Sequence, residues 1–205
     1  MNKTKSDFET RVMNIRDFEI RAGEGEGEGP KITGYAAVFN EVSEEMWGFR
    51  EKIAPGAFDD VLEDDVRATF NHDSNYILGR STAGTLKIKQ DDVGLGVEID
   101  PPETSWVKDL LVTMQRKDVN QMSFAFRVAE DGQEWLVTDE GEWLRTITKF
   151  SELADVSVVA FPAFPQTNAE VRARFEEEVK IRPPEVIPRN LDKELQLKRM
   201  RMKMG

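Results

Sequence analysis

The stretch Ala68-Thr69-Phe70-Asn71-His72-Asp73 contains the only histidine of the 205 residues. Apolar and polar side chains alternate from Val66 to Phe70, a pattern that predicts a short β-strand. Asn71 and Asp73 interrupt this pattern and indicate a turn. We therefore expect His72 where a strand meets a loop, a position at which a rigid scaffold can present a reactive group. The alternative is a surface or hydrogen-bonded structural histidine, because most histidines are not catalytic.

Short strands are predicted on both sides of this stretch. Alternating apolar side chains predict strands over residues 17–21, 31–39, 47–53, 85–89, 95–100, 122–128, 134–138, 143–147 and 153–159. A helix is expected from Thr104 or Ser105, and a last helix from Ala169 to about Glu178. Many short strands with two or three helices predict an α+β chain, built as a mainly antiparallel β-barrel or sandwich flanked by a few helices.

The two ends of the chain differ in composition from its middle. Residues 1–15 are expected to form a flexible N-terminal extension, and the Gly/Glu repeat at 23–30 a flexible acidic loop. Residues 169–205 carry 10 basic and 7 acidic side chains, and the last eight residues carry four bases and no acid. These shifts predict a β-barrel domain over residues 16–168, followed by a helix and a basic tail over 169–205.

Composition excludes several classes of function. A net charge of -11 argues against general binding of nucleic acid, since a phosphate backbone requires a basic surface. No apolar run approaches the ~20 residues of a membrane helix, and no export signal is visible at the start. The chain has no cysteine, which excludes a disulfide scaffold and a thiolate nucleophile. One histidine and scattered acids give no metal-ligand cluster, so neither a metal nor a cofactor is expected.

Three side chains could cooperate in nucleophilic catalysis. Ser123 is a single hydroxyl in an otherwise apolar strand, and Asp155 is a carboxylate that interrupts another. A serine nucleophile needs a base within hydrogen-bond reach, and the base needs a partner that stabilises its charged form. His72 could be that base, with Asp155 or the nearby Glu152 as the partner. Alternatively, Ser123 only bonds a neighbouring strand and Asp155 points to solvent.

Six stretches, taken in their order along the chain, resemble the prohead maturation proteases of tailed phages (caudoviruses). The stretches are GYAAVFN at 34–40, EKIAPGAF at 51–58, FNHD at 70–73, GR at 79–80, QMSFAF at 121–126 and DVSVVAFPAF at 155–164. The resemblance extends over about residues 16–168. This family is similar in fold to the herpesvirus capsid-maturation proteases (assemblin), which use a histidine, a serine and a third orienting residue in that chain order.

The resemblance assigns a role to each candidate residue. It implies that Ser123 is the nucleophile, that His72 is the general base, and that Asp155 orients the base, with Glu152 as the alternative third member. Backbone N–H groups near a strand end are expected to bind the oxyanion, and the loop from Ala160 to Ala163 is our choice, with Phe161 and Ala163 as donors.

The resemblance also implies where this chemistry takes place. A serine endopeptidase of this family would cleave capsid and scaffold protein segments, and itself, during procapsid maturation. Its partners would be the major capsid protein precursor with its scaffold segment, and further copies of the chain in a homo-oligomer. It would work inside the assembling procapsid in the host cytoplasm, without nucleic-acid or membrane partners. The tail would then be a site of self-cleavage.

Two other functions remain open. A non-catalytic capsid-assembly or scaffold protein could keep the same barrel, and the charge and methionine content of the tail fit it equally well. A glycosidase that uses paired acids is also conceivable, but 39 acidic residues single out no pair. Labelling of Ser123 by a serine-directed covalent probe would favour the protease and leave the scaffold protein without support.

Overall fold

A computed structural model describes residues 8–14, 16–21, 29–46, 48–139, 141–161, 175–177 and 179–180. Its largest element is a five-stranded sheet with the strand order β1-β9-β12-β5-β6. The strands of this sheet are β1 (Glu9–Asn14), β9 (Gln121–Val128), β12 (Phe150–Val159), β5 (Arg67–Phe70) and β6 (Asp73–Arg80). The pairing of β12 with β5 is parallel, and the other pairings in this sheet are antiparallel.

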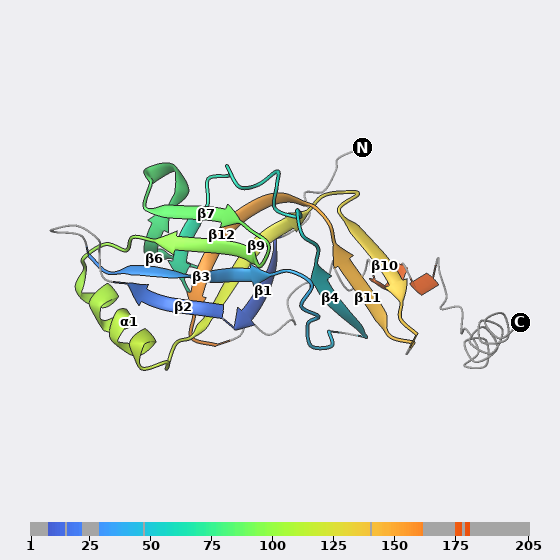
Figure 1. Cartoon of the computed structure of the whole chain (residues 1–205), viewed down its shortest axis with the longest axis horizontal. Coiled ribbons are helices and arrows are strands. Elements are labelled where there is room, and N and C mark those ends of the chain that lie inside the picture. Colours follow the sequence, from blue (N-terminus) through green and yellow to red (C-terminus); the bar gives the residue numbers. More distant parts are fainter. Residues whose placement is uncertain are drawn as a thin grey trace, which may run out of the picture.

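Two smaller sheets accompany it. The strands of the four-stranded sheet are, in spatial order, β2 (Arg16–Arg21), β3 (Lys31–Val38), β8 (Gly94–Ile99) and β7 (Leu86–Gln90). The strands of the three-stranded sheet are β10 (Gln133–Val137), β11 (Trp143–Ile147) and β4 (Phe49–Ile53). The helix α1 (Ser105–Gln115) follows β8, and a 3-10 turn, η1 (Ser81–Ala83), follows β6. The three-stranded sheet lies at the opposite end of the molecule from α1 (Figure 1).

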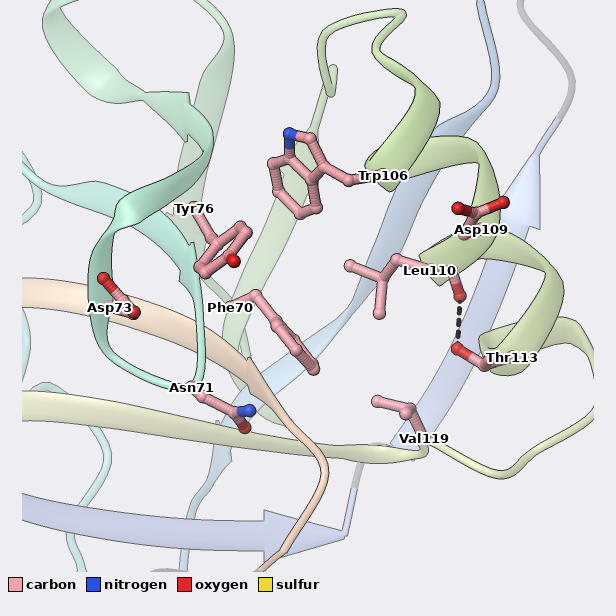
Figure 2. A pocket seen from close by; sticks show the side chains of 9 residues that line it. All are labelled: Phe70, Asn71, Asp73, Tyr76, Trp106, Asp109, Leu110, Thr113 and Val119. Atoms are coloured by element: carbon pink, nitrogen blue, oxygen red, sulfur yellow. Dashed lines mark hydrogen bonds between the residues drawn. The ribbon is translucent and has the colours of Figure 1, made fainter.

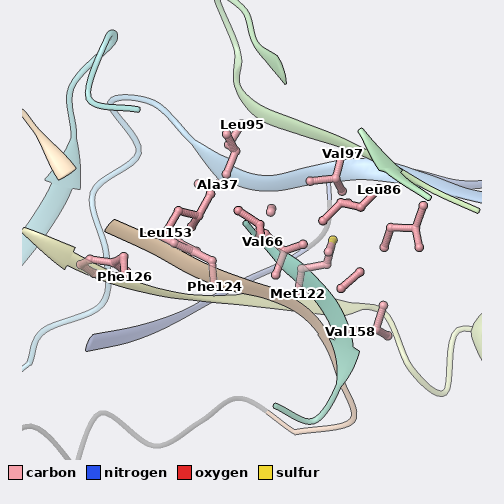
Figure 3. Close-up of a cluster of buried hydrophobic side chains, with 14 of the residues drawn as sticks. Ala37, Val66, Leu86, Leu95, Val97, Met122, Phe124, Phe126, Leu153 and Val158 are labelled. Carbon is pink, nitrogen blue, oxygen red and sulfur yellow. The ribbon is translucent and has the colours of Figure 1, made fainter. Parts of the chain in front are cut away.

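The main core lies between the five-stranded and four-stranded sheets. Side chains such as Phe124 and Val158 on one sheet and Leu95 and Val97 on the other point into the same space (Figure 3). Successive residues of a strand face opposite sides of a sheet, so every second residue of these strands can reach this core. The alternation leaves the other face of β9, β12 and β5 free for different side chains, and that face carries the candidate site.

A cluster of paired charges connects the large sheet to the three-stranded sheet. The Arg145 side chain on β11 is 1% exposed, and it donates to Glu9 Oε2 at 2.8 Å and to Glu51 Oε2 at 2.7 Å. Arg11 donates from Nε to Glu51 Oε1 at 2.6 Å. Two guanidinium groups and two carboxylates balance each other, which permits burial that an isolated charge would not tolerate.

The structure confirms the predicted α+β character but not a closed barrel. Within the described residues the strands form three separate sheets, of which the larger two face each other as in a sandwich. The predicted barrel is therefore wrong for this part of the chain, because β1 and β6 remain edge strands of one sheet and β2 and β7 of the other. Alternation of side chains predicts a strand but not its partner, which explains the difference. The likeness to the herpesvirus fold stays a prediction.

The structure describes only parts of the two terminal intervals that were predicted from composition. Within residues 1–15, expected as an extension, β1 pairs along its length with β9. Residues 175–177 and 179–180 are helical, in agreement with part of the last predicted helix. Most of the Gly/Glu repeat, the start of that helix and the basic tail lie outside the described residues. The division at residue 168 stays a prediction.

Candidate active site

A row of hydroxyl side chains crosses the outer face of the five-stranded sheet. Ser123 on β9 is the register partner of Ser157 on β12, which is in turn the partner of Thr69 on β5. Directly paired residues share a face of a sheet, so the three hydroxyls point the same way. Their chain neighbours Met122 and Val156 point into the core instead. Period-two alternation thus places polar groups on one face and apolar groups on the other.

The turn between β5 and β6 brings His72 over this row. Asn71 and His72 both have positive φ angles, 56° and 57°. Asparagine adopts this left-handed conformation readily, whereas such strain at other residues often marks a functional site. Hydrogen bonds to β12 and the residue after it hold the turn: Asn71 N–H donates to Val158 O at 2.9 Å, and Ala160 N–H to Asn71 Oδ1 at 3.0 Å.

Three predicted site residues form a continuous chain of hydrogen bonds. His72 Nε2 lies 2.7 Å from Ser123 Oγ, and His72 Nδ1 lies 2.8 Å from Asp155 Oδ1. These distances suit an imidazole that accepts the Ser123 O–H at Nε2 and donates its Nδ1–H to Asp155. Asp155 and Ser157 are two residues apart and share a face of β12, next to a register shift between Leu153 and Asp155. The arrangement has the connectivity of a nucleophile, a base and an orienting acid.

Burial differs among these groups. The side chains of His72 and Asp155 are 23% and 19% exposed, whereas Ser123 is fully buried. A carbonyl carbon therefore reaches Ser123 Oγ only after the atoms that cover it have moved. Partial burial of the other two groups strengthens their mutual electrostatic interaction relative to water.

Ser157 is a fourth member of the cluster that the sequence did not indicate. Its Oγ lies 2.5 Å from Thr69 Oγ1, 3.1 Å from His72 Nδ1 and 3.2 Å from Asp155 Oδ1. It also accepts the backbone N–H of His72 at 3.2 Å. The hydroxyl thus contacts both the imidazole and the carboxylate. A serine among valines looks like any outward-facing strand residue, and its pairing with Ser123 is known only from the strand register in the structure.

Glu152 and Asp155, the two candidates for the orienting acid, bond different partners. Glu152 pairs with Arg127 on the neighbouring strand β9, whereas Asp155 is the acid that bonds His72. Phe161, one of the two expected oxyanion donors, lies two residues after β12 and is 81% exposed. The other, Ala163, lies outside the described residues. The oxyanion assignment stays a prediction.

Two general features bear on the chemistry available here. Among the described residues, the structure contains no group of three or more acidic or imidazole side chains arranged to hold a metal ion. In the same part of the chain, no helix is long and apolar enough to cross a membrane.

Comparison with known proteins places the chain in a family of serine peptidases. A sequence profile of the caudovirus prohead serine protease family matches residues 16–181, which is most of the chain. The chain belongs to this family. It is therefore a serine peptidase, as the resemblance of the six sequence stretches predicts. No curated protein and no solved structure matches the chain.

Proposed function

We propose that this prohead protease cleaves peptide bonds with Ser123 as nucleophile, His72 as general base and Asp155 as the acid that orients the base. The observation that carries the proposal is the pair of short contacts from the two imidazole nitrogens, to Ser123 Oγ on one side and to Asp155 on the other. Ser123 gains nucleophilicity only while its proton can leave, and His72 Nε2 is placed to accept it.

The proposed reaction has two halves. Ser123 Oγ attacks the scissile carbonyl carbon and its proton passes to His72 Nε2, which gives a tetrahedral intermediate with a negatively charged oxygen. His72 then returns the proton to the leaving amine, and the acyl-enzyme forms. In the second half a water molecule takes the place of the amine and the same proton transfers release the acid and restore Ser123. Asp155 stabilises the imidazolium in both halves.

The substrates follow from the family. A prohead protease acts on capsid proteins inside the phage procapsid in the host cell. We propose the major capsid protein precursor and its scaffold segment as the substrates of this chain, and the chain itself as a further one. The proposal also includes a homo-oligomer within the procapsid, and the backbone N–H groups of Phe161 and Ala163 as oxyanion donors.

Co-expression with the capsid precursor tests the proposal. Ser123→Ala is expected to leave the capsid precursor uncut and to abolish labelling by a fluorophosphonate, while the protein stays folded. Ser151→Ala is the matched control, because Ser151 is an exposed serine on the same strand as Asp155. A Ser123→Ala protein that still cuts the precursor would eliminate Ser123 as nucleophile. An unlabelled wild-type protein that leaves the precursor intact would favour the scaffold alternative.

A further inference from the structure

A cavity of about 470 Å³ lies between α1 and the β5–β6 turn, which carries His72. Asn71 and Asp73, the two chain neighbours of His72, are among the residues that line it. On the opposite side it is lined by residues of α1 and by Val119, which precedes the strand of Ser123 (Figure 2). Its size is within the range of about 300–1,000 Å³ that is usual for ligand sites.

The walls of this cavity are largely apolar and aromatic. Phe70, Tyr76, Trp106 and Leu110 contribute side chains from the β5–β6 hairpin and from α1 (Figure 2). The Tyr76 and Trp106 rings meet edge to face, with centroids 5.2 Å apart and an interplanar angle of 71°. Tyr76 remains 43% exposed. An aromatic pair open to solvent next to a cavity can stack on an aliphatic chain or on a cationic group.

The charged groups of the cavity are both acidic. Asp73 lies on β6 and Asp109 on α1, on opposite sides of the cavity (Figure 2). Neither carboxylate forms an ion pair with another described residue, and no lysine or arginine is among the described residues that line the cavity. Long basic side chains bury their aliphatic stem on apolar surface while the charged head stays near solvent or an anion. Asp73 Oδ1 accepts two hydrogen bonds from Asn75, which leave the negative charge of the carboxylate in place. Aromatic walls with two carboxylates that lack a cationic partner among the described residues match such a side chain.

We propose that this cavity is a substrate subsite that takes a lysine or arginine side chain of an extended peptide. The stem would lie against Trp106, Tyr76 and Phe70, and the cationic head would interact with Asp73 and Asp109. The inference rests on the proposed function, since a peptide whose side chain is bound here would run along the β5–β6 turn that carries His72. It adds a recognition element: the protease selects basic segments.

The chain itself contains a segment with the required chemistry. Residues 198–205 read Lys-Arg-Met-Arg-Met-Lys-Met-Gly, with four basic side chains and no acidic one. The chain as a whole has a net charge of -11. A basic segment tethered to an acidic protein is held at a high local concentration, so this tail is the natural first ligand.

Binding of a fluorescent peptide with the sequence of residues 198–205 tests the subsite independently of catalysis. The protein is the full-length Ser123→Ala chain with its four tail bases changed to glutamine, which prevents competition by the chain's own tail. At low ionic strength Asp109→Asn is expected to weaken binding about three- to fivefold. Trp106→Ala is expected to weaken it about tenfold. Asp92→Asn, at an exposed carboxylate of the β7–β8 turn, is the control and should change nothing.

A second peptide, with norleucine for lysine and citrulline for arginine, completes the design. It should bind about tenfold more weakly, and Asp109→Asn should not weaken it further. Equal affinity for both peptides would overturn the subsite. So would affinities of Asp109→Asn and Trp106→Ala that match that of the Asp92→Asn control. Selective binding without cleavage by the wild-type chain would instead refute the proposed protease chemistry and leave the basic-peptide site standing. Cleavage by the wild-type chain without selective binding would refute the basic-peptide site and leave the proposed protease chemistry standing.

Discussion

Replacing Ser157 with alanine removes the hydroxyl that joins the turn of His72 to the sheet. This group is fully buried and lies within 3.2 Å of four polar atoms: Thr69 Oγ1, His72 N and Nδ1, and Asp155 Oδ1. Alanine leaves the His72 amide and the Thr69 hydroxyl without this partner. A buried polar group that loses its partner costs about 1–3 kcal/mol, so the free energy of unfolding should fall by about that amount.

The effect on catalysis is expected to be separate from the loss of stability. Without the hydroxyl the imidazole can tilt between Ser123 and Asp155, and misplacement of a catalytic group by about 1 Å can cost ~100-fold in rate. We expect kcat/KM to fall ten- to a hundredfold, which corresponds to about 1.4–2.7 kcal/mol of transition-state stabilisation. The loss should appear in kcat, with KM nearly unchanged, because Ser157 lies beneath the base rather than in the cavity that would hold substrate.

Steady-state kinetics on a cleavable peptide, measured well below the melting temperature, provides the assay. Thr69→Val removes only the hydroxyl that anchors Ser157 and should give a smaller fall in kcat. Ser151→Ala should have wild-type kinetics, because that serine is exposed on the same strand. A folded Ser157→Ala protein with kcat within about twofold of wild type would show that Ser157 only fills space, and the positioning role would be abandoned.

Three further predictions concern the base, the buried charges and the tail. His72→Ala should lower kcat/KM by at least about a hundredfold, as measured with the same peptide, since general-base catalysis contributes 10²–10⁴-fold; a loss under tenfold would exclude it. Burial favours a raised pKa for Glu51, but Arg11 and Arg145 outweigh this effect and lower the pKa below the ordinary 4.5. Urea unfolding should therefore show that the free energy of unfolding falls as the pH drops below about 4.5, and that it falls less in Glu51→Gln. Identical pH curves for the two proteins would contradict this. Intact mass should show that active protein shortens itself near or beyond residue 168 while Ser123→Ala stays at full length, and equal masses would assign the tail another task.

The sequence predicted most strands correctly because alternation of apolar side chains is a local property. It did not predict β1, whose residues Glu9-Thr10-Arg11-Val12-Met13-Asn14 mix charges with apolar groups. Glu9 is nevertheless buried, because Arg145 from a distant strand pairs with it. A charged residue reads as exposed until its partner is known, and that partner is 136 residues away. The pairing of charges on strands that are distant in sequence is known only from the tertiary structure.

The candidate site could be predicted to the extent that its residues are conspicuous. His72 is the only imidazole, Ser123 is the single hydroxyl of an otherwise apolar strand, and Asp155 interrupts another. The choice between Asp155 and Glu152 could not be made from spacing, since both are close in sequence. It depends on the strand register, which pairs Glu152 with Arg127 and brings Asp155 to the side of the sheet that faces His72.

The N-terminal strand connects the site to the rest of the molecule. β1 pairs with β9 along its length, and Val12 is the register partner of Ser123 itself. On the same strand, Glu9 and Arg11 reach across to Arg145 and Glu51 in the three-stranded sheet. The strand that carries Ser123 is therefore held between β12, which carries Asp155, and β1, which is fixed by buried charges. Removal of β1 would expose one edge of β9 and take Glu9 from Arg145 and Arg11 from Glu51. We therefore expect the geometry at Ser123 to depend on a segment that sequence composition alone marked as an extension.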